Sequence, residues 1–183
     1  MGRTAIVDID NTLWEFSDAF HRALQKFNPN FPPPVLWTRY QIWEGYCSEE
    51  DFITAINSIH HQQDNDDYRP YPEAPKFLSS LHESGFRVIL ASHRVPTTRQ
   101  PTERWLAQHR LPYDELHLSR DKTVLFPKAD VVVDDAPPIL EKAVQCGLLG
   151  AGLRFPWNAA YAGNGFHLFP NLNDVLDYIL KSV

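Results

Sequence analysis

Nearly continuous apolar segments that alternate with helical segments constrain the fold of this 183-residue chain most strongly. Residues 4–7, 87–91 and 131–133 consist almost wholly of aliphatic and β-branched residues, without an alternation of apolar and polar positions. Such runs are typical of parallel strands that are buried on both faces. We expect further strands at residues 115–118 and near residues 152–155.

The segments between these strands have helical periodicity. Gly85 and Gly147 each stand two residues beyond such a segment, where a helix usually places its C′ glycine. The predicted helices cover residues 74–83, 102–108, 139–145 and 172–180. Strands that alternate with helices predict a doubly wound α/β domain with a parallel sheet.

Residues 14–70 do not follow this alternation. They contain three of the five tryptophans (Trp14, Trp37 and Trp43), a run of prolines, and amphipathic stretches at residues 17–27 and 49–61. We therefore expect a small α-helical cap inserted into an α/β core made of residues 1–13 and 71–183. Residues 60–67, which begin with two histidines and end with acidic residues, are interpreted as a solvated helix end and loop rather than a metal site.

The composition excludes several classes of protein. Hydrophobic residues make up 43% of the chain and charged residues 22%, which is ordinary for a globular domain. A net charge of −6 without a lysine and arginine run argues against a nucleic-acid duplex as partner. Cys47 and Cys146 lie far apart, so neither a disulfide framework nor a zinc site is expected. Without a long apolar stretch or a signal pattern, we expect no membrane attachment and a cytoplasmic location.

Polar residues follow four of the predicted strands directly. In a parallel sheet the carboxyl ends of the strands meet at one edge, where ligands bind. The residues expected to converge there are Asp8, Asp10, Ser92, His93, Arg94, Arg120, Asp121, Lys122, Asp134 and Asp135.

The pair Asp8 and Asp10 carries the clearest chemistry. Two neighbouring carboxylates at the end of a buried strand repel each other and lose hydration, which a divalent cation between them would offset. With Mg²⁺, one carboxylate can attack phosphorus while the other transfers a proton. Ser92 offers a hydroxyl donor, whereas Lys122 and Arg120 offer positive charge for a phosphoryl group.

Each later element also has a simpler interpretation. Ser92 could be a turn residue, and Lys122 could be solvated, with Lys128 as its competitor for the same role. Asp134 and Asp135 could simply cap the helix that begins at the following prolines, instead of completing an oxygen-rich cation site. The occurrence of all these elements in this order favours a phosphoryl-transfer site.

The same order of motifs resembles the haloacid dehalogenase superfamily of phosphohydrolases. The resemblance covers Asp8 to Leu13, Ser92, Lys122, and the pair Asp134 and Asp135. It implies a Mg²⁺-dependent phosphatase in which Asp8 forms an aspartyl-phosphate and Asp10 is the general acid and base. It also implies that the cation is bound by Asp8, by the backbone carbonyl of Asp10 and by Asp135, with Asp134 in support.

Within that superfamily the chain looks most like the 5′(3′)-deoxyribonucleotidases. Residues 118–124 and 129–135, and the later segment 155–158, resemble stretches of that family. The resemblance implies a nucleoside monophosphate as the small phosphorylated substrate. The candidates for contact with it are Phe16, Trp43, His93, Arg94 and Arg120.

Other interpretations stay open from the sequence. Phe16 and Trp43 could stack on a base or could only pack the cap onto the core. Trp14 and the residues around Ser92 resemble the magnesium-dependent phosphatase-1 group, which acts on sugar phosphates or phosphoproteins, although a cap of this size favours small molecules. A phosphate-binding protein without turnover would be expected to lack Asp8 or Asp10, and both are present.

Overall fold

The computed structural model describes residues 2–40, 42 and 44–183. In these residues a parallel sheet of six strands has the order β3-β2-β1-β4-β5-β6. The strands are β1 (Arg3–Val7), β2 (Phe86–Ser92), β3 (Glu115–Leu118), β4 (Val131–Val133), β5 (Leu149–Leu153) and β6 (His167–Phe169). The predicted doubly wound α/β fold is confirmed.

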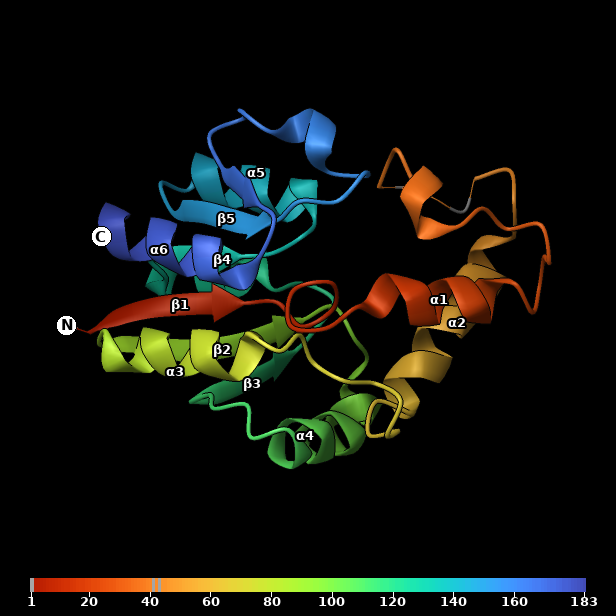
Figure 1. The fold of residues 1–183 in the computed structure, drawn as a ribbon, viewed down its shortest axis with the longest axis horizontal. Coiled ribbons are helices and arrows are strands. Elements are labelled where there is room, and N and C mark those ends of the chain that lie inside the picture. Colours follow the sequence, from red (N-terminus) through yellow and green to blue (C-terminus); the bar gives the residue numbers. More distant parts are fainter. Residues whose placement is uncertain (1, 41, 43) are drawn as a thin grey trace.

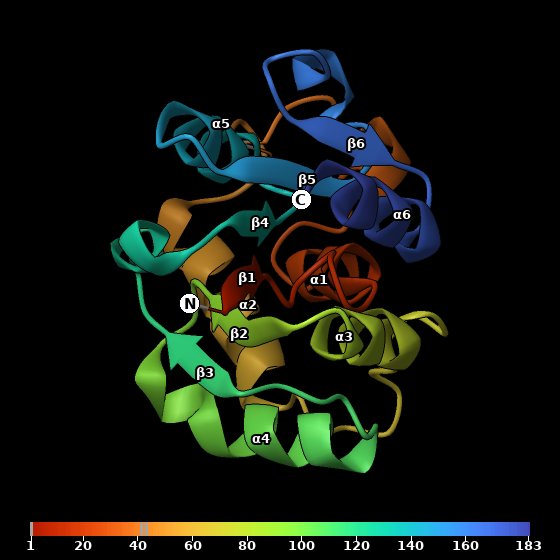
Figure 2. The same cartoon turned by 90° about the vertical axis from the view of Figure 1, so that its left-hand side faces the viewer.

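Both faces of the sheet are covered by helices, which explains the continuous apolar strands. Ala5 and Val7 belong to the core on the side of α3 (Ala74–Glu83) and α6 (Leu172–Ser182). Ile6 points the other way, into a separate core with residues of α5 (Pro137–Gln145). Figure 2 shows these layers along the sheet, with α4 (Arg99–Gln108) beside β3 at one edge.

The element bounds differ from the predictions in informative places. Gly85 and Gly147 have φ values of 84° and 79°, which confirms them as C′ residues of α3 and α5. β5 begins three residues earlier than the predicted strand, and the chain turns away after Leu153. The edge strand β6 was not predicted, because it has only three residues after a glycine-containing loop.

Residues between β1 and α3 form a helical layer at one end of the sheet. It contains α1 (Phe16–Leu24), the 3-10 turn η1 (Pro34–Leu36) and α2 (Glu49–His61). In Figure 1 the strand arrows point toward α1 and α2, while both chain termini lie at the opposite end. The two ends of this segment lie side by side, since the Tyr71 amide donates to the Leu13 carbonyl over 2.8 Å.

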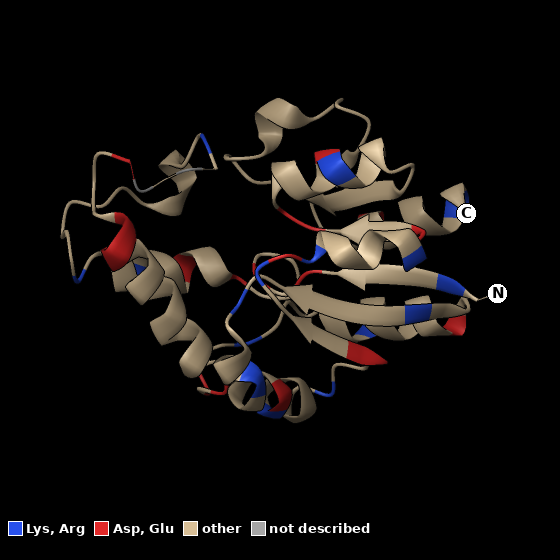
Figure 3. Ribbon diagram, turned by 180° about the vertical axis from the view of Figure 1, so that it is seen from behind, with Lys and Arg blue, Asp and Glu red and all other residues tan. Residues whose placement is uncertain are grey.

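Short 3-10 turns connect the remaining elements. They are η2 (Pro96–Thr98), η3 (Thr123–Lys128) and η4 (Ala159–Tyr161). Basic and acidic residues are interspersed over the sheet domain, and both signs meet at the strand ends that face the helical layer (Figure 3). None of the helices in the described part of the chain has the length and apolar character that a bilayer span requires.

Candidate active site

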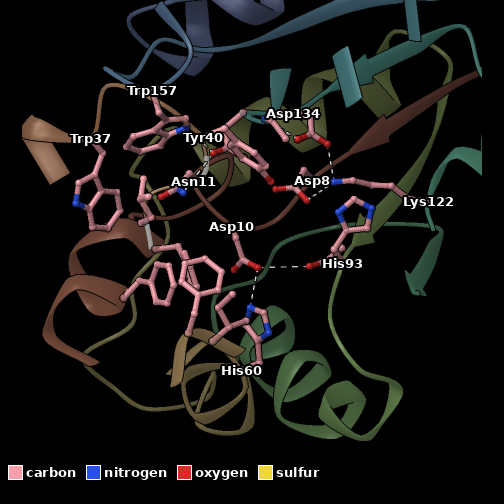
Figure 4. Close-up of a pocket in the computed structure, with 18 residues that line it drawn as sticks. Asp8, Asp10, Asn11, Trp37, Tyr40, His60, His93, Lys122, Asp134 and Trp157 are labelled. Atoms are coloured by element: carbon pink, nitrogen blue, oxygen red, sulfur yellow. Dashed lines mark hydrogen bonds and ion pairs between the residues drawn. The ribbon is translucent and has the colours of Figure 1, made fainter. Parts of the chain in front are cut away.

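The register of the sheet brings the polar strand ends together. Val7 pairs with Leu90 on one side and with Val133 on the other, so the residues that follow these strands are neighbours. A cavity of about 310 Å³ opens at this edge, between the sheet and the helical layer (Figure 4). Its polar end is formed by Asp8, Asp10, Asn11, His60, Ser92, His93, Lys122, Asp134 and Asp135.

Lys122 lies between two carboxylates at the polar end. Its Nζ is 2.7 Å from Asp8 Oδ1 and 2.5 Å from Asp134 Oδ2, and the lysine is only 2% exposed. Burial lowers the pKa of Lys122, but the two carboxylates raise it more, so the ammonium stays charged. Lys128 is exposed at the end of η3. Of the two candidate lysines, the structure therefore places Lys122 in the cavity.

Three carboxylates form a group suited to a divalent cation. Oxygen atoms of Asp8, Asp134 and Asp135 lie within 4.8 Å of one another, and all three residues are buried. Burial raises the pKa of Asp8 to about 7, and burial together with the Asp134 charge raises that of Asp135. A raised carboxyl pKa means that the charged form is held unfavourably, here first because the groups are buried and then because other carboxylates are close.

A count of charges agrees with that conclusion. Among the described residues gathered here, four carboxylates face two permanently charged basic groups, which would leave an excess of two negative charges when all four carboxylates are ionised. These groups are Asp8, Asp10, Asp134 and Asp135 against Arg94 and Lys122. Hard carboxylate oxygens with this excess charge fit an ion such as Mg²⁺.

The carboxylate of Asp10 points away from that group and is held by four donors. Arg94 Nη2 lies 2.6 Å from Oδ1, to which Trp14 Nε1 donates over 2.9 Å. His60 Nε2 lies 2.8 Å from Oδ2, and Ser92 Oγ donates to the same oxygen over 3.4 Å. Although burial opposes ionisation, Arg94 and His60 hold the pKa of Asp10 well below its usual range.

Arg94 does not reach the cavity, which corrects its prediction as a substrate contact. Its guanidinium is fully buried and lies under Asp10, where it also donates to Ser92, Gln63 and Thr102. A buried guanidinium needs a counter-ion, and the strand-end carboxylate provides one. Arg120 is exposed and absent from the cavity lining as well, so its predicted contact is not supported. His93 does line the cavity.

The interpretation of residues 60–67 as a solvated helix end is wrong for His60 and Gln63. They are 2% and 0% exposed and contact Asp10 and Arg94, respectively. Ile56 and His60 are four residues apart, on one side of α2, and Gln63 follows three residues later in the turn just after the helix. This spacing was the available sequence signal.

The other end of the cavity is mostly apolar, and most of its residues come from the helical layer. Phe16, a predicted substrate contact, lines this end, and its ring lies 5.2 Å from that of Phe20 and 5.5 Å from that of His60. Trp43, the other predicted aromatic contact, lies outside the described residues. Further lining residues that were not predicted from the sequence are Phe20, Trp37, Ile42, Phe52 and Ile56 of the helical layer, Tyr40 beside Asp8 (Figure 4), and Ala136 and Trp157 of the loops after β4 and β5. Figure 4 shows Trp37 and Trp157 on the same side of the cavity.

Comparisons with known proteins agree with the chemistry of this site. Residues 4–160 match the family model described as 5′ nucleotidase, deoxy (pyrimidine), cytosolic type C protein. A Chlorobaculum tepidum protein assigned as a 5′(3′)-deoxyribonucleotidase is 35% identical over 72 residues. That match spans 36% of this chain and 35% of the relative, about a third of its length.

Solved structures share the fold at low sequence identity. A hydrolase from Pseudomonas syringae has a TM-score of 0.65 at 14% identity, with 99% of both chains covered. The D,D-heptose 1.7-bisphosphate phosphatase from B. bronchiseptica, complexed with magnesium and phosphate, has a TM-score of 0.58 at 15% identity, again with 99% of both chains covered. These similarities extend to the sheet and to the helical layer together.

Proposed function

The chain belongs to the 5′ nucleotidase family of the deoxy (pyrimidine), cytosolic type C description, and from this membership we propose that it hydrolyses nucleoside monophosphates with the help of Mg²⁺. The observation that carries the proposal is the division of one cavity into two ends. One end gathers carboxylates and a lysine, and the other is lined by aromatic rings. A phosphate group fits the first end and a base fits the second.

Asp8 is the proposed nucleophile. One of its carboxylate oxygens attacks phosphorus, the bond from phosphorus to the ester oxygen breaks, and an aspartyl-phosphate forms. Asp10 is the proposed general acid and base: because it is ionised in the substrate-free site, the proton that it passes to the leaving oxygen comes from the monoanionic phosphate group, and it then takes a proton from the water that releases phosphate. Lys122, which already contacts Asp8, stabilises the added negative charge, and the Ser92 hydroxyl is a donor for a phosphoryl oxygen.

Asp8, Asp135 and the backbone carbonyl of Asp10 would hold the Mg²⁺ ion, with Asp134 in support. When bound, the ion would offset the excess negative charge and polarise a phosphoryl oxygen. The donor set supports this role, because carboxylate oxygens bind hard cations.

Residues 14–70 are the proposed cap, and residues 1–13 with 71–183 the proposed core. Phe16 and Trp43 would contact the base, and His93 would contact the substrate near the phosphate. A cap across the strand ends leaves room for a small metabolite. We place this activity in the cytoplasm, in keeping with the family description.

A substrate screen tests the proposal. Purified protein is assayed for phosphate release from deoxy- and ribonucleoside monophosphates, sugar phosphates and a phosphoserine peptide, with Mg²⁺ and with EDTA. We expect a nucleoside monophosphate to give the highest kcat/KM, with no turnover in EDTA or by Asp8→Asn. Faster hydrolysis of a sugar phosphate or of the peptide would contradict the nucleotidase assignment and favour the magnesium-dependent phosphatase-1 alternative.

A further inference from the structure

Trp157 is buried between the proposed metal ligand Asp135 and the helical layer. Its indole Nε1 donates to Asp135 Oδ2 over 3.1 Å, and the residue is 4% exposed. The ring stacks on Phe155 at 4.4 Å with an interplanar angle of 4°, and lies 5.9 Å from the Trp37 ring. These contacts on both sides hold the indole in place, so its N–H has a fixed direction.

A second donor reaches the same carboxylate oxygen. Asn11 Nδ2 lies 3.3 Å from Asp135 Oδ2, while Asn11 Oδ1 accepts from the Ser17 amide over 2.9 Å. The backbone of Asn11 is left-handed, with a φ of 54°, a conformation that asparagine adopts more readily than most residues. The turn after β1 thus aims the Asn11 amide at Asp135.

The main chain of Asp135 is held as well. Asn158, which is completely buried, donates through Nδ2 to the carbonyls of Asp135 and Leu153 over 3.0 and 2.9 Å. Both side-chain donors therefore act on Oδ2, and among the described residues none donates to Oδ1. An oxygen that accepts two hydrogen bonds is oriented by them, and one carboxylate oxygen of Asp135 lies within 4.8 Å of oxygens of Asp8 and Asp134.

We propose that Trp157 is a positioning residue that, together with Asn11, fixes the Asp135 carboxylate so that Oδ1 is presented to the divalent cation. This inference rests on the proposed Mg²⁺ site. Outer hydrogen bonds to a metal-binding carboxylate typically change metal affinity by about 10-fold to 100-fold when they are removed. Trp157 itself touches neither the cation nor the reacting atoms in this role.

Isothermal titration calorimetry of the metal-free full chain with Mg²⁺ measures the affinity for the cation and does not depend on turnover. Trp157→Phe keeps an aromatic ring for Phe155 and Trp37 but deletes the N–H, and should raise the Mg²⁺ Kd about 10-fold to 100-fold. Asn11→Gly removes the other donor and tolerates the positive φ, and should also weaken binding. The control is Trp105→Phe, because Trp105 is equally buried and its indole donates to the Tyr68 carbonyl.

The possible outcomes distinguish failure of the positioning role of Trp157 from failure of the proposed Mg²⁺ site. Weaker Mg²⁺ binding by Trp157→Phe, with Trp105→Phe within about twofold of the wild type, supports the positioning role. An unchanged Kd for Trp157→Phe, or an equal loss in both tryptophan variants, overturns it while the metal site stands. Absence of Mg²⁺ binding by the wild-type chain overturns the metal site and this inference together.

Discussion

His60, near the end of helix α2, contacts Asp10 over 2.8 Å although the two residues are 50 positions apart in the chain. Because the Asp10 pKa is held low, the carboxylate is ionised and can only accept, so His60 Nε2 is the donor. His60 Nδ1 is buried without a partner among the described residues. The helical layer thereby contributes directly to the orientation of the second carboxylate of the site.

Replacement of His60 by phenylalanine should therefore slow turnover. The variant keeps a ring beside Phe16 but removes the donor, and a hydrogen bond to a charged group contributes about 1.5–3 kcal/mol. We expect kcat for a nucleoside monophosphate to fall about 10-fold to 100-fold, with little change in KM. His82→Phe is the control, since His82 contacts Asp114 near the amino end of β3. A wild-type kcat for His60→Phe would contradict this role.

Arg94→Met should destabilise the fold as well as the site. The substitution keeps much of the side-chain volume but leaves Asp10 without its buried counter-ion, and breaking a buried ion pair costs about 3–5 kcal/mol. Thermal unfolding should show a Tm lower by about 6–20 °C, at about 2–4 °C per kcal/mol for a domain of this size. Arg99→Met, which removes a half-exposed pair with Glu103, should have a much smaller effect. Equal Tm losses in the two variants would contradict the argument.

The strand ends could be predicted from the sequence because their signal is local. Asp8, Ser92, Lys122 and Asp135 each lie at the end of a short apolar run or within four residues after it, and parallel pairing brings such positions to one edge. The direction in which a side chain points after the strand depends instead on contacts with residues that are distant in the sequence. Arg94 stands two residues after Ser92, the last residue of β2, yet it turns beneath Asp10 because that carboxylate is its counter-ion.

Contacts between the helical layer and the core depend on packing that no short pattern records. His60 is adjacent to the exposed His61, and the pair looks polar until the face of the helix is known. Gly152 is a similar case within a strand. A Cβ at that position would lie 1.9 Å from the Asp134 carbonyl oxygen, so the close approach of β5 to the site requires glycine there.

Mg²⁺ should stabilise the protein more in mildly alkaline than in mildly acidic solution. The folded-state pKa of Asp8, about 7, lies above its unfolded value of 3.8, so its contribution to stability is present below the unfolded pKa and is lost as pH rises through 7. The charge that then accumulates is offset by a bound cation, whereas at low pH the cation must displace protons. Scanning calorimetry with and without Mg²⁺ should show a larger Tm increase at about pH 8 than at about pH 5.5. A larger increase at the lower pH would contradict the assignment of Asp8 to the cation site.

Asp8→Asn should abolish turnover and raise the Tm of the metal-free protein at about pH 8. The amide cannot attack phosphorus, and it removes a buried charge that the site holds unfavourably without a cation. The gain should be a few degrees, since about 1 kcal/mol corresponds to about 2–4 °C. Asp177→Asn, on the exposed face of α6, should leave both quantities unchanged. Substantial phosphate release by Asp8→Asn would reject the covalent mechanism.

Phe16→Ala tests whether the apolar end of the cavity binds a base. If it does, the loss of stacking removes about 1–3 kcal/mol, or about 10-fold to 100-fold in kcat/KM for a nucleoside monophosphate. Hydrolysis of p-nitrophenyl phosphate should fall much less, because its smaller ring reaches the phosphate end without the same contact. The control is Phe31→Ala, since Phe31 is buried against Trp37 and Tyr46 and does not line the cavity. It should lower thermal stability and affect both substrates alike. Equal losses on the two substrates in Phe16→Ala would reject base stacking and leave the phosphatase proposal standing.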